Sequence, residues 1–441
     1  NFSKQSESNF SHEIIVTDIK NTNKEVIERF SEYSNSLYLA RDEEFIKNKI
    51  TDADIIQIEY WNHPLVYKFL HSFNFPKSRV ILCSHNNGLS RPKIITKDSV
   101  DFCDIFLALT KATKDHPLFT EKNSDNYKKK LRFAKYPVDF ERFHSVNRKI
   151  HEGFNIGYVG TLDYSKIHQD FISMSSSIAK IIPNSKFIVC GNGSDEEKLK
   201  LEAINYKSIN FEFRGFIENI KDILENLDVF GYPLNPTHFG SGEQALIEAM
   251  YVGLPVVTFS NPPEKEIIIN NETGIIVDSK SDYVKAIKFL YDNPEERRRI
   301  GGNAKEYITN ELGPNKCFED FEKIYFEVMK LEKTVKYFNR PINNGSKNND
   351  LGARLFIQSL GDSGNEFLQS YENNGELVNE EINGIISNTE ISMKVQTKGS
   401  IFQYLYFFPD DRYLNFWAGL ISLIDKNILE NLHFSLPNTA L

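Results

Sequence analysis

The chain has 441 residues, a length typical of about three domains with sizeable cores. Its 61 acidic residues outnumber its 52 lysines and arginines, which gives a formal net charge of -9. This balance excludes nucleic acid as the main partner, because phosphate contacts need a basic surface. No apolar run reaches the roughly 18 residues that a membrane-spanning helix needs.

The cysteines are scattered and form no C-x-x-C pair, so the sequence predicts no structural metal site. Cys83 and Cys190 fall in apolar, strand-like runs, which favours buried free thiols over disulfides. The chain begins at Asn1 rather than at methionine and shows no signal peptide. We therefore expect a fragment that is truncated at its N-terminus.

Residues 1–152 alternate short apolar runs with amphipathic segments. Helical patterns fall between the apolar runs, and this alternation predicts a parallel sheet covered by helices. The strands are expected at 12–17, 55–59, 79–83 and 104–109, and the helices at 24–33, 43–49 and 66–73.

Residues 153–332 repeat the same alternation, with a late helix expected at 317–331. Two such blocks in tandem predict a two-lobed α/β protein that binds its ligand at the carboxyl ends of the strands. The strands of this second block are expected at 155–159, 186–190, 209–213, 229–232, 255–259 and 274–277.

The most informative stretch runs from Phe239 to Val257. Gly240, Ser241 and Gly242 let the backbone approach a ligand, and a helix is expected to follow from 243 to 252. A helix that begins this way presents free N–H groups at its positive end, which favours a phosphate or pyrophosphate. Glu248, inside this helix, has a carboxylate that can accept hydrogen bonds from sugar or ribose hydroxyls.

This stretch resembles the donor-site signature of the retaining glycosyltransferases of family 4, which have the GT-B fold. The resemblance implies two Rossmann-like domains facing a cleft: an N-terminal acceptor-side domain and a C-terminal donor domain. It also implies a nucleotide-sugar co-substrate, with no metal ion and no other cofactor. The segment 135–143 is similar to the family's inter-domain segment, with Pro137 in place of a glycine.

The resemblance assigns roles in donor binding to three positions after the first strand of the second block. Lys166 stands at the family's phosphate-contacting lysine, and Gly160 belongs to the same strand-to-loop segment. Thr161 stands where an arginine is usual, so one cation is missing, although a hydroxyl can still donate one hydrogen bond.

Two glutamates flank the signature helix in the family, with seven residues between them. Glu248 matches the second, which is similar to the residue that binds the ribose, whereas Gly240 occupies the position of the first. Glu243 or Gln244 is therefore expected to replace the missing sugar contact, with Ala245 in the same donor-binding turn. A first-turn acid that complements the helix dipole is an equally good interpretation of Glu243.

His85 follows the strand 79–83 and precedes Gly88. A single histidine at such a place is commonly a hydrogen-bonded structural residue. The resemblance instead implies a contact with the transferred sugar or the acceptor. His168 and His238 carry weaker signals, and a lone loop histidine such as His238 is usually solvated.

Lysines and an arginine cluster between Lys122 and Lys135. Some relatives use a basic surface of the first lobe to sit on anionic membranes, so this stretch suggests a peripheral membrane contact. A solvated polar loop and helix explains the same composition.

Residues 333–350 have linker composition, and the strands expected beyond them lack the βα alternation. The turn Pro409-Asp-Asp-Arg412 is similar to turns in modules that accompany some bacterial glycan-assembly glycosyltransferases. We therefore expect a β-rich accessory module over 351–441, with an arbitrary spacer or an incomplete domain as the alternative. Its strands are expected at 353–358, 391–396, 400–408 and 433–435.

Together these features predict a cytoplasmic retaining hexosyltransferase of bacterial surface-polysaccharide synthesis, working in the cytoplasm or at the inner face of the membrane. A nucleotide-sugar is the expected donor and a glycan or lipid-linked glycan the expected acceptor. Lys166 and the amides around Ser241 would hold the pyrophosphate, Glu248 the ribose, and His85 the sugar and acceptor. A nucleotide-sugar 2-epimerase of GT-B-like fold and an inactive carbohydrate-binding or scaffold protein remain alternatives.

Overall fold

The computed structural model describes residues 9–17, 28, 37–40, 42–122, 124–146, 149–206, 209–338, 350–373, 393 and 395–424. The chain divides into two compact units. The first unit comprises 1–109, 113–134 and 318–441, and the second comprises 110–112 and 135–317. The chain thus returns to the first unit at its end, an arrangement that the expected order of consecutive domains did not include.

The first unit contains a four-stranded parallel sheet in the order β3-β4-β5-β6. Its strands are β3 (Ile56–Tyr60), β4 (Val80–Ser84), β5 (Ile105–Ala108) and β6 (Leu131–Phe133). A separate parallel pair joins β1 (Ile14–Val16) to β2 (Leu37–Leu39). The predicted parallel sheet is confirmed, although β2 and β6 were missed. The helix expected at 24–33 lies outside the described residues, apart from Glu28.

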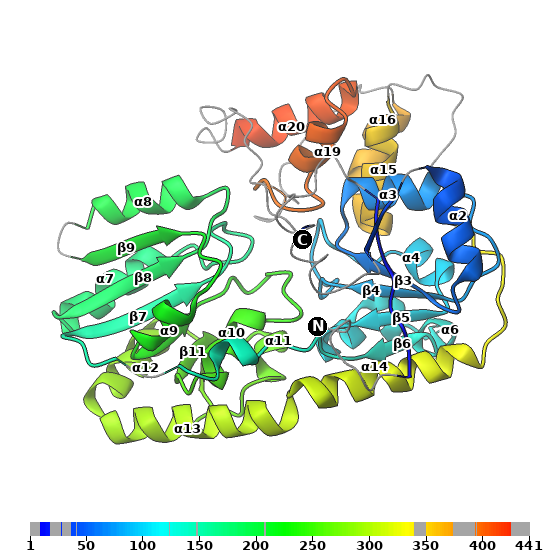
Figure 1. The fold of residues 1–441 in the computed structure, drawn as a ribbon. Helices are drawn as coiled ribbons and strands as arrows, with labels where there is room; N and C mark the ends of the chain where they lie inside the picture. The colour runs from blue at the N-terminus through cyan, green and yellow to red at the C-terminus, as the bar shows by residue number, and fades with distance from the viewer. Residues whose placement is uncertain are drawn as a thin grey trace. The chain divides into compact units, whose positions relative to one another are not determined.

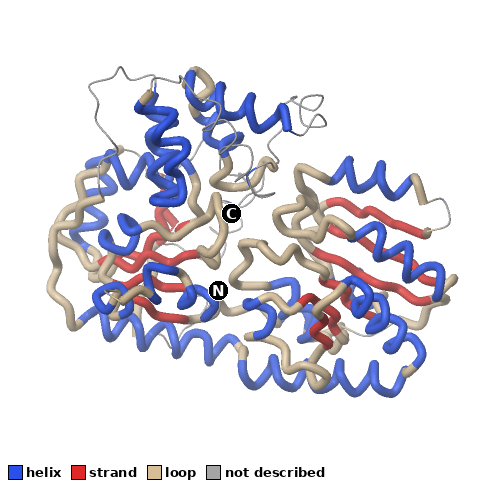
Figure 2. The backbone as a smooth tube through the Cα atoms, turned by 180° about the vertical axis from the view of Figure 1, so that it is seen from behind, coloured by secondary structure: helices blue, strands red, loops and turns tan. Residues whose placement is uncertain are grey.

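Helices connect these strands, as the blue and red segments of Figure 2 show. Asp42 caps the first of the longer helices by accepting from the amide of Phe45, and Thr96 caps α4 through the amide of Ser99. The helices are α2 (Glu43–Asp52), α3 (Pro64–Ser72), α4 (Lys97–Phe102), α5 (Pro117–Thr120) and α6 (Asp125–Lys128).

The second unit contains a six-stranded parallel sheet in the order β12-β11-β10-β7-β8-β9. All six predicted strands are present, within one or two residues of their expected ends. They are β7 (Phe154–Val159), β8 (Ser185–Cys190), β9 (Asn210–Gly215), β10 (Val229–Tyr232), β11 (Val256–Phe259) and β12 (Ile275–Val277).

The helices of the second unit alternate with its strands. The helix expected at 243–252 is present as α10, and the late helix as α14, which crosses from the second unit into the first. The helices are α7 (Phe171–Ile181), α8 (Glu196–Ile204), α9 (Lys221–Glu225), α10 (Gln244–Tyr251), α11 (Pro262–Lys265), α12 (Lys280–Asp292), α13 (Pro294–Glu311) and α14 (Pro314–Met329).

The order of this sheet places a topological switch point between β7 and β10. The chain moves outward from β7 through β8 to β9, and then returns to the other side of β7 with β10 (Figure 1). Open parallel sheets bind ligands outside the carboxyl ends of the strands at such a point. The loops after β7, β10 and β11 are therefore the first place to look for a site.

The prediction of a β-rich module beyond residue 350 is wrong for the residues that the structure describes. Both runs expected as strands at 353–358 and 400–408 are helical. The helices are α15 (Leu351–Leu360), α16 (Asn365–Glu372), α19 (Ile401–Phe407) and α20 (Arg412–Ile424). The strand expected at 433–435 lies outside the described residues, as does most of 391–396.

These C-terminal helices share one core with the first sheet instead of forming a separate module. Trp417 and Phe356 lie in the same buried cluster as Leu82 of β4 and Phe106 of β5. Figure 1 shows α15 beside α3, and the two helices are in contact. Residues 350–373 and 395–424 are therefore part of the first unit.

The Asp-Arg turn belongs to the start of a helix, because α20 begins at Arg412 directly after Asp411. The Asp411 carboxylate accepts from the amides of Tyr413 and Leu414 at 3.0 and 3.2 Å, and from the amide of Ala353 at 2.8 Å. Asp411 therefore caps α20 and ties it to the start of α15.

The predicted linker is also packed on the first unit over its first residues. Thr334 forms an antiparallel bridge with Ser78, and the Lys336 ammonium lies 2.5 Å from a carboxylate oxygen of Asp104. Phe338 is buried in the core of this unit. The rest of the predicted linker, 339–349, lies outside the described residues.

The basic stretch between Lys122 and Lys135 uses three of its cations within the protein. The Lys130 ammonium donates to three backbone carbonyls, among them that of Val100 at 2.8 Å. Arg132 pairs with Glu327, and Lys135 lies 3.5 Å from Glu266. Peripheral membrane contact through this stretch stays a prediction, with fewer cations available for it.

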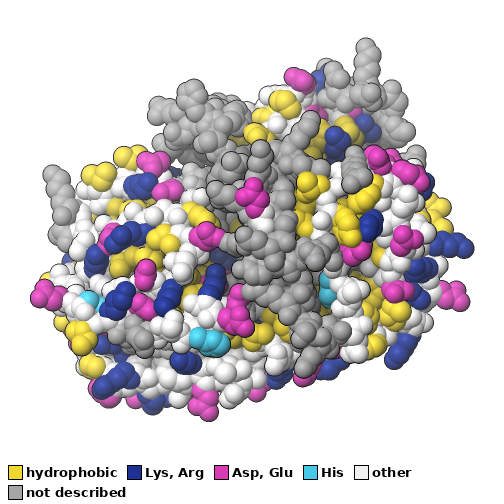
Figure 3. All heavy atoms as spheres, viewed as in Figure 1, with side chains coloured by type: hydrophobic (Ala, Val, Ile, Leu, Met, Phe, Trp, Pro, Cys, Tyr) yellow, Lys and Arg dark blue, Asp and Glu magenta, His cyan; other side chains and the backbone are white. Residues whose placement is uncertain are grey.

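On the face drawn in Figure 3, lysines and arginines are interspersed with aspartates and glutamates. In the described part of the chain, no helix combines the length and the apolar character that crossing a membrane requires. The four cysteines are free and buried, which confirms the expectation for Cys83 and Cys190.

Candidate functional site

The loops that follow β7 and β8 are held in close contact at the switch point. The amide of Gly160 donates to the carbonyl of Cys190 at 3.0 Å, and the amide of Leu162 to the carbonyl of Asn192 at 2.9 Å. A Cβ atom at Gly191 would lie 1.9 Å from the carbonyl oxygen of Gly160. A glycine is therefore required at 191, and the loop after β7 has a fixed course.

This course fixes Lys166, which lies in the turn that follows. Its amide donates to the carbonyl of Asp163 at 2.9 Å, and its own carbonyl accepts from the amide of Asn235 at 2.8 Å. The Asp163 side chain closes the turn by accepting from the amide of Ser165 at 3.0 Å. The loops after β7 and β10 are thereby joined around the lysine, whose side chain is largely buried.

The Lys166 ammonium forms an ion pair with Glu243, the residue just before α10. It lies 2.8 Å from both carboxylate oxygens, and the Tyr232 hydroxyl at the end of β10 donates to the same carboxylate at 2.8 Å. Glu243 has no exposed side-chain surface. Its backbone is left-handed, with φ of 39° and ψ of 46°, a conformation that costs a non-glycine residue free energy unless its surroundings impose it.

Glu243 stays ionised in this setting. Burial by itself would raise the pKa of its carboxyl, but the charge and hydrogen bonds of the Lys166 ammonium and the hydrogen bond from Tyr232 outweigh burial and lower that pKa to about 2. Glu243 stands directly before α10, as an acid that complements the helix dipole would, but it is also a buried anion that pairs with the lysine predicted to contact phosphate.

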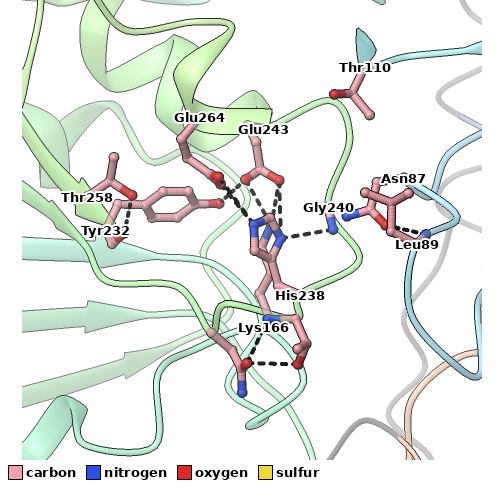
Figure 4. A network of polar contacts seen from close by, with 12 residues as sticks. Asn87, Leu89, Thr110, Lys166, Tyr232, His238, Gly240, Glu243, Thr258 and Glu264 are labelled. Carbon is pink, nitrogen blue, oxygen red and sulfur yellow. Dashed lines mark hydrogen bonds and ion pairs between the residues drawn. The ribbon is translucent and has the colours of Figure 1, made fainter. Parts of the chain in front are cut away.

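His238 and Glu264 extend this network, as Figure 4 shows. His238 Nε2 lies 3.2 Å from the Glu264 carboxylate, and its Nδ1 accepts from the amide of Gly240 at 3.0 Å. His238 and Glu264 are both buried, so the expectation of a solvated His238 is wrong. The accepting Nδ1 fixes the proton on Nε2, which donates to Glu264.

Gly240 departs from the family pattern for a steric reason that the structure reveals. A Cβ atom at this position would lie 1.8 Å from a carboxylate oxygen of Glu243 and 2.5 Å from the Lys166 ammonium. The Glu243 carboxylate thus fills the space that a side chain at 240 would enter. The expectation that Glu243 or Gln244 replaces the missing sugar contact stays a prediction.

Replacing Gly240 by alanine should therefore disrupt the network. We expect Gly240→Ala to lower the free energy of unfolding by about 1–3 kcal/mol, the usual cost of overpacking, because the methyl group displaces the Glu243 carboxylate. Gly242→Ala is the matched control, since a Cβ atom at Gly242 would meet no other atom within 4 Å. Urea denaturation measures both variants, and equal stabilities would contradict the packing argument.

Glu248 does not join this network in the structure. It is buried on α10 and pairs with Arg142 of the short 3-10 helix Glu141–Phe143. Burial raises the pKa of Glu248, and Arg142 opposes that shift. Arg142 was not predicted as a site residue, although it lies in the segment 135–143 that resembles the family's inter-domain segment.

The remaining residues predicted to bind the donor lie at the same edge of the sheet, outside the network around Glu243. Ser241 is buried, Gly242 and Ala245 are half-buried, and Gln244 is exposed at the start of α10. The Thr161 carbonyl accepts from the Tyr158 hydroxyl at 3.0 Å. The first amides of α10 have no carbonyl partner within the helix, so they are oriented to meet an anion.

His85 lies in the first unit, directly after β4. Its Nε2 is 2.6 Å from a carboxylate oxygen of Glu59, and its ring stacks on Trp61 at 3.9 Å between centroids. Its amide donates to the carbonyl of Tyr60 at 2.9 Å, which joins the loops after β3 and β4. The structure therefore places His85 in a polar and aromatic group at the carboxyl edge of its sheet.

His168 is a structural residue in the loop after β7. Its amide donates to the carbonyl of Pro233 at 2.9 Å, and its ring stacks on Phe259. Burial lowers the pKa of His168, so the imidazole is neutral at pH 7.

Tyr232 and Glu264 are the members of the network that the sequence did not reveal. Tyr232 lies in a predicted strand that was given no role at the site, and Glu264 carried no motif. A signal for both existed in their position, since Tyr232 ends β10 and Glu264 lies in the short helix α11 that follows β11.

Two groups of side chains in the described residues have ligand atoms close enough to hold a metal ion. One consists of Glu59, Cys83 and His85, and the other of His238, Glu243 and Glu264. In the second group the Lys166 ammonium already bonds both oxygens of Glu243. A cation is therefore supplied there by the protein itself.

Residues 139–307 match the family model described as glycosyl transferases group 1. The matched segment lies within the second unit and contains Lys166, Gly240, Glu243 and Glu248. The match supports the prediction that the chain is a glycosyltransferase.

A curated relative also supports the prediction of a glycosyltransferase. The capsular polysaccharide biosynthesis glycosyltransferase CapM of Staphylococcus aureus is 26% identical over 207 residues, which are 44% of this chain and 53% of CapM. The chain therefore spans about half the length of this relative.

Solved structures show that the fold is GT-B. An S. aureus TarM mutant, in complex with Fondaparinux, alpha-GlcNAc-glycerol and UDP, superposes with a TM-score of 0.55 and 16% identity over 66% of this chain and 58% of its own. HepE of Anabaena, in complex with UDP and glucose, superposes with a TM-score of 0.55 and 11% identity over 69% of this chain and 89% of its own.

Proposed function

We propose that this protein transfers a sugar from a nucleotide-sugar to a glycan or lipid-linked glycan acceptor in surface-polysaccharide synthesis. The observation that carries the proposal is the group of Lys166, Gly240 and the start of α10 at the switch point of a GT-B donor unit. The relative named for capsular polysaccharide biosynthesis and the UDP-bound structural neighbours support the same proposal.

In this proposal the second unit stabilises the leaving pyrophosphate. Charge develops on that group during transfer, so donors held in advance supply a large share of the catalysis. Lys166 supplies the cation, and the first amides of α10 supply the hydrogen bonds. The protein would therefore need no metal ion, and addition of EDTA should leave the transfer rate unchanged.

The ion pair between Lys166 and Glu243 limits how Lys166 can bind a donor. The ammonium has three protons and gives hydrogen bonds to both carboxylate oxygens. The diphosphate must share this lysine with Glu243. Glu243 thereby holds the Lys166 side chain in position. A contact between Glu243 and the sugar stays a prediction, because this carboxylate is buried in the structure.

The proposed transfer retains the configuration of the sugar. The leaving phosphate accepts the proton of the acceptor hydroxyl, which attacks from the same face, and His85 of the first unit helps to position sugar and acceptor. Proton NMR of the product tests this step, since the anomeric coupling of the product should match that of the donor.

The first experiment is a thermal shift of the chain with UDP-, GDP-, ADP- and CMP-sugars. A ligand at about 100 times its dissociation constant adds about 2.7 kcal/mol of stability, so one nucleotide class should raise the melting temperature.

Glu248→Ala should weaken donor binding by about 1.5–3 kcal/mol, the value of one charge-assisted hydrogen bond. Glu306→Ala, at an exposed site on α13, is the matched control.

The outcomes separate the alternatives. Unchanged donor affinity in Glu248→Ala would contradict its role at the ribose. Conversion of the nucleotide-sugar without an acceptor would identify a 2-epimerase. Binding of glycan without any response to nucleotide-sugars would identify a carbohydrate-binding protein.

A further inference from the structure

The C-terminal part of the chain reaches the carboxyl edge of the first sheet, where His85 lies. The hydroxyl of Thr397 accepts from the buried Lys93 ammonium at 2.6 Å. Gly399 has φ of +81°, and a Cβ atom there would lie 3.0 Å from the carbonyl oxygen of Asn62. Residues 395–400 are therefore seated on the loops that follow β3 and β4.

This segment places Lys398 at Trp61. The Lys398 ammonium lies 5.3 Å from the centroid of the Trp61 ring. Trp61 also stacks on His85, with 15° between the ring planes. A cation, an indole ring and an imidazole that pairs with Glu59 thus form one group, and the cation comes from a distant segment of the chain.

Lys398 is a cation that has lost much of its water without gaining an anion. Burial lowers the pKa of its ammonium. In the part of the chain that the structure describes, no carboxylate pairs with it. Such a setting favours an incoming oxyanion, because that ion would replace the missing water and the missing counter-charge.

We propose that Lys398, together with Trp61 and His85, binds an oxyanion carried by the acceptor, either a phosphate or a carboxylate. The ammonium contacts the acidic substituent, and the partly exposed indole beside it offers apolar surface to the sugar. The acceptor is thereby an acidic glycan or a glycosyl phosphate. The identification of this ligand as the acceptor rests on the proposed function, whereas the binding of an anion at Lys398 does not depend on that function.

Trp61 provides a direct readout. The chain has two tryptophans, and Trp417 is fully buried in the core of the first unit. In a Trp417→Phe background, tryptophan fluorescence reports on Trp61 alone. We would titrate this protein with glucose 1-phosphate, with glucuronate and with glucose.

We expect at least one of the two anionic sugars to change the Trp61 emission with saturation, and glucose to have no effect at the same concentration. The anion that binds distinguishes a phosphate from a carboxylate site. Lys398→Gln should weaken the binding at least tenfold, and Lys398→Arg should retain most of it. Lys68→Gln is the matched control, because its ammonium lies 5.8 Å from the ring of Phe408 on the same unit and should not matter.

An equal response to glucose and to the anionic sugars would overturn the inference, as would unchanged binding in Lys398→Gln. The thermal shift with nucleotide-sugars runs in parallel on the same variants. Donor binding without an anion response at Trp61 would reject this inference and leave the proposed function standing. An anion response without any donor binding would do the reverse.

Discussion

Replacement of Lys166 by methionine is expected to lower the free energy of unfolding by about 3–5 kcal/mol. The substitution keeps the length of the side chain and removes its charge, so Glu243 would remain buried without its partner. The Tyr232 hydroxyl can satisfy only part of that carboxylate. Urea denaturation measures the loss, and the same variant should no longer be stabilised by any nucleotide-sugar.

The double variant Lys166→Met with Glu243→Gln should recover part of this loss, because neither charge is then left alone. Lys285→Met is the surface control: its pair with Asp282 is exposed, and such pairs contribute less than about 1 kcal/mol. A loss below about 1 kcal/mol in Lys166→Met would show that the buried pair is not what holds the network together.

Acid should weaken the same network. The pKa of Glu243 lies at about 2 in the folded protein, below its ordinary value of 4.5. A lowered pKa means that the ionised form stabilises the fold above pH 4.5 and that this contribution is lost as the pH falls towards 2. Stability should therefore decline less steeply over this range in Glu243→Gln than in the unaltered protein.

Trp417→Ala is expected to destabilise the first unit by about 3–5 kcal/mol. The indole is fully buried, packs on Phe356 and Phe367, and donates from Nε1 to the Ser370 hydroxyl at 2.8 Å. The same core contains Leu82 of β4. Hydrogen exchange should therefore become faster in β4 as well as in α20.

Phe416→Ala is the control for this prediction, because the Phe416 side chain, next to Trp417 in the chain, is 38% exposed. This substitution should lower the free energy of unfolding much less and leave hydrogen exchange in β4 unchanged. A separate C-terminal module would give another result: Trp417→Ala would then speed exchange in α20 and leave β4 protected. That outcome would contradict the shared core.

Local pattern was sufficient to predict both parallel sheets. Runs such as Val80–Ser84 are apolar throughout, because a strand inside a parallel sheet is buried on both faces. The same reasoning failed beyond residue 350. The run Ile401–Phe407 is rich in residues that favour strands, yet Ser400 caps it as a helix and its apolar side chains enter the core of the first unit. Tertiary burial outweighed propensity there.

At the candidate site, the sequence identified residues that follow strands, but it did not identify the side chains that those residues contact. Lys166 and Glu243 were both identified, although nothing in their 77-residue separation indicates an ion pair. His238 was assigned to solvent because a loop histidine has no local signal for burial. Its burial follows from Glu264, which the neighbouring strand β11 brings to the same edge of the sheet.

The sequence by itself determined the two parallel α/β sheets and the glycine-rich start of α10, because strand burial, helix periodicity and close backbone approach depend on residues near one another in the chain. Only the tertiary structure decided which side chains meet. It paired Lys166 with Glu243, explained the glycine at 240 by the space that this carboxylate occupies, and brought Lys398 to Trp61. Contacts of this kind depend on the order of strands in the sheet and on shared burial, and neither leaves a local pattern.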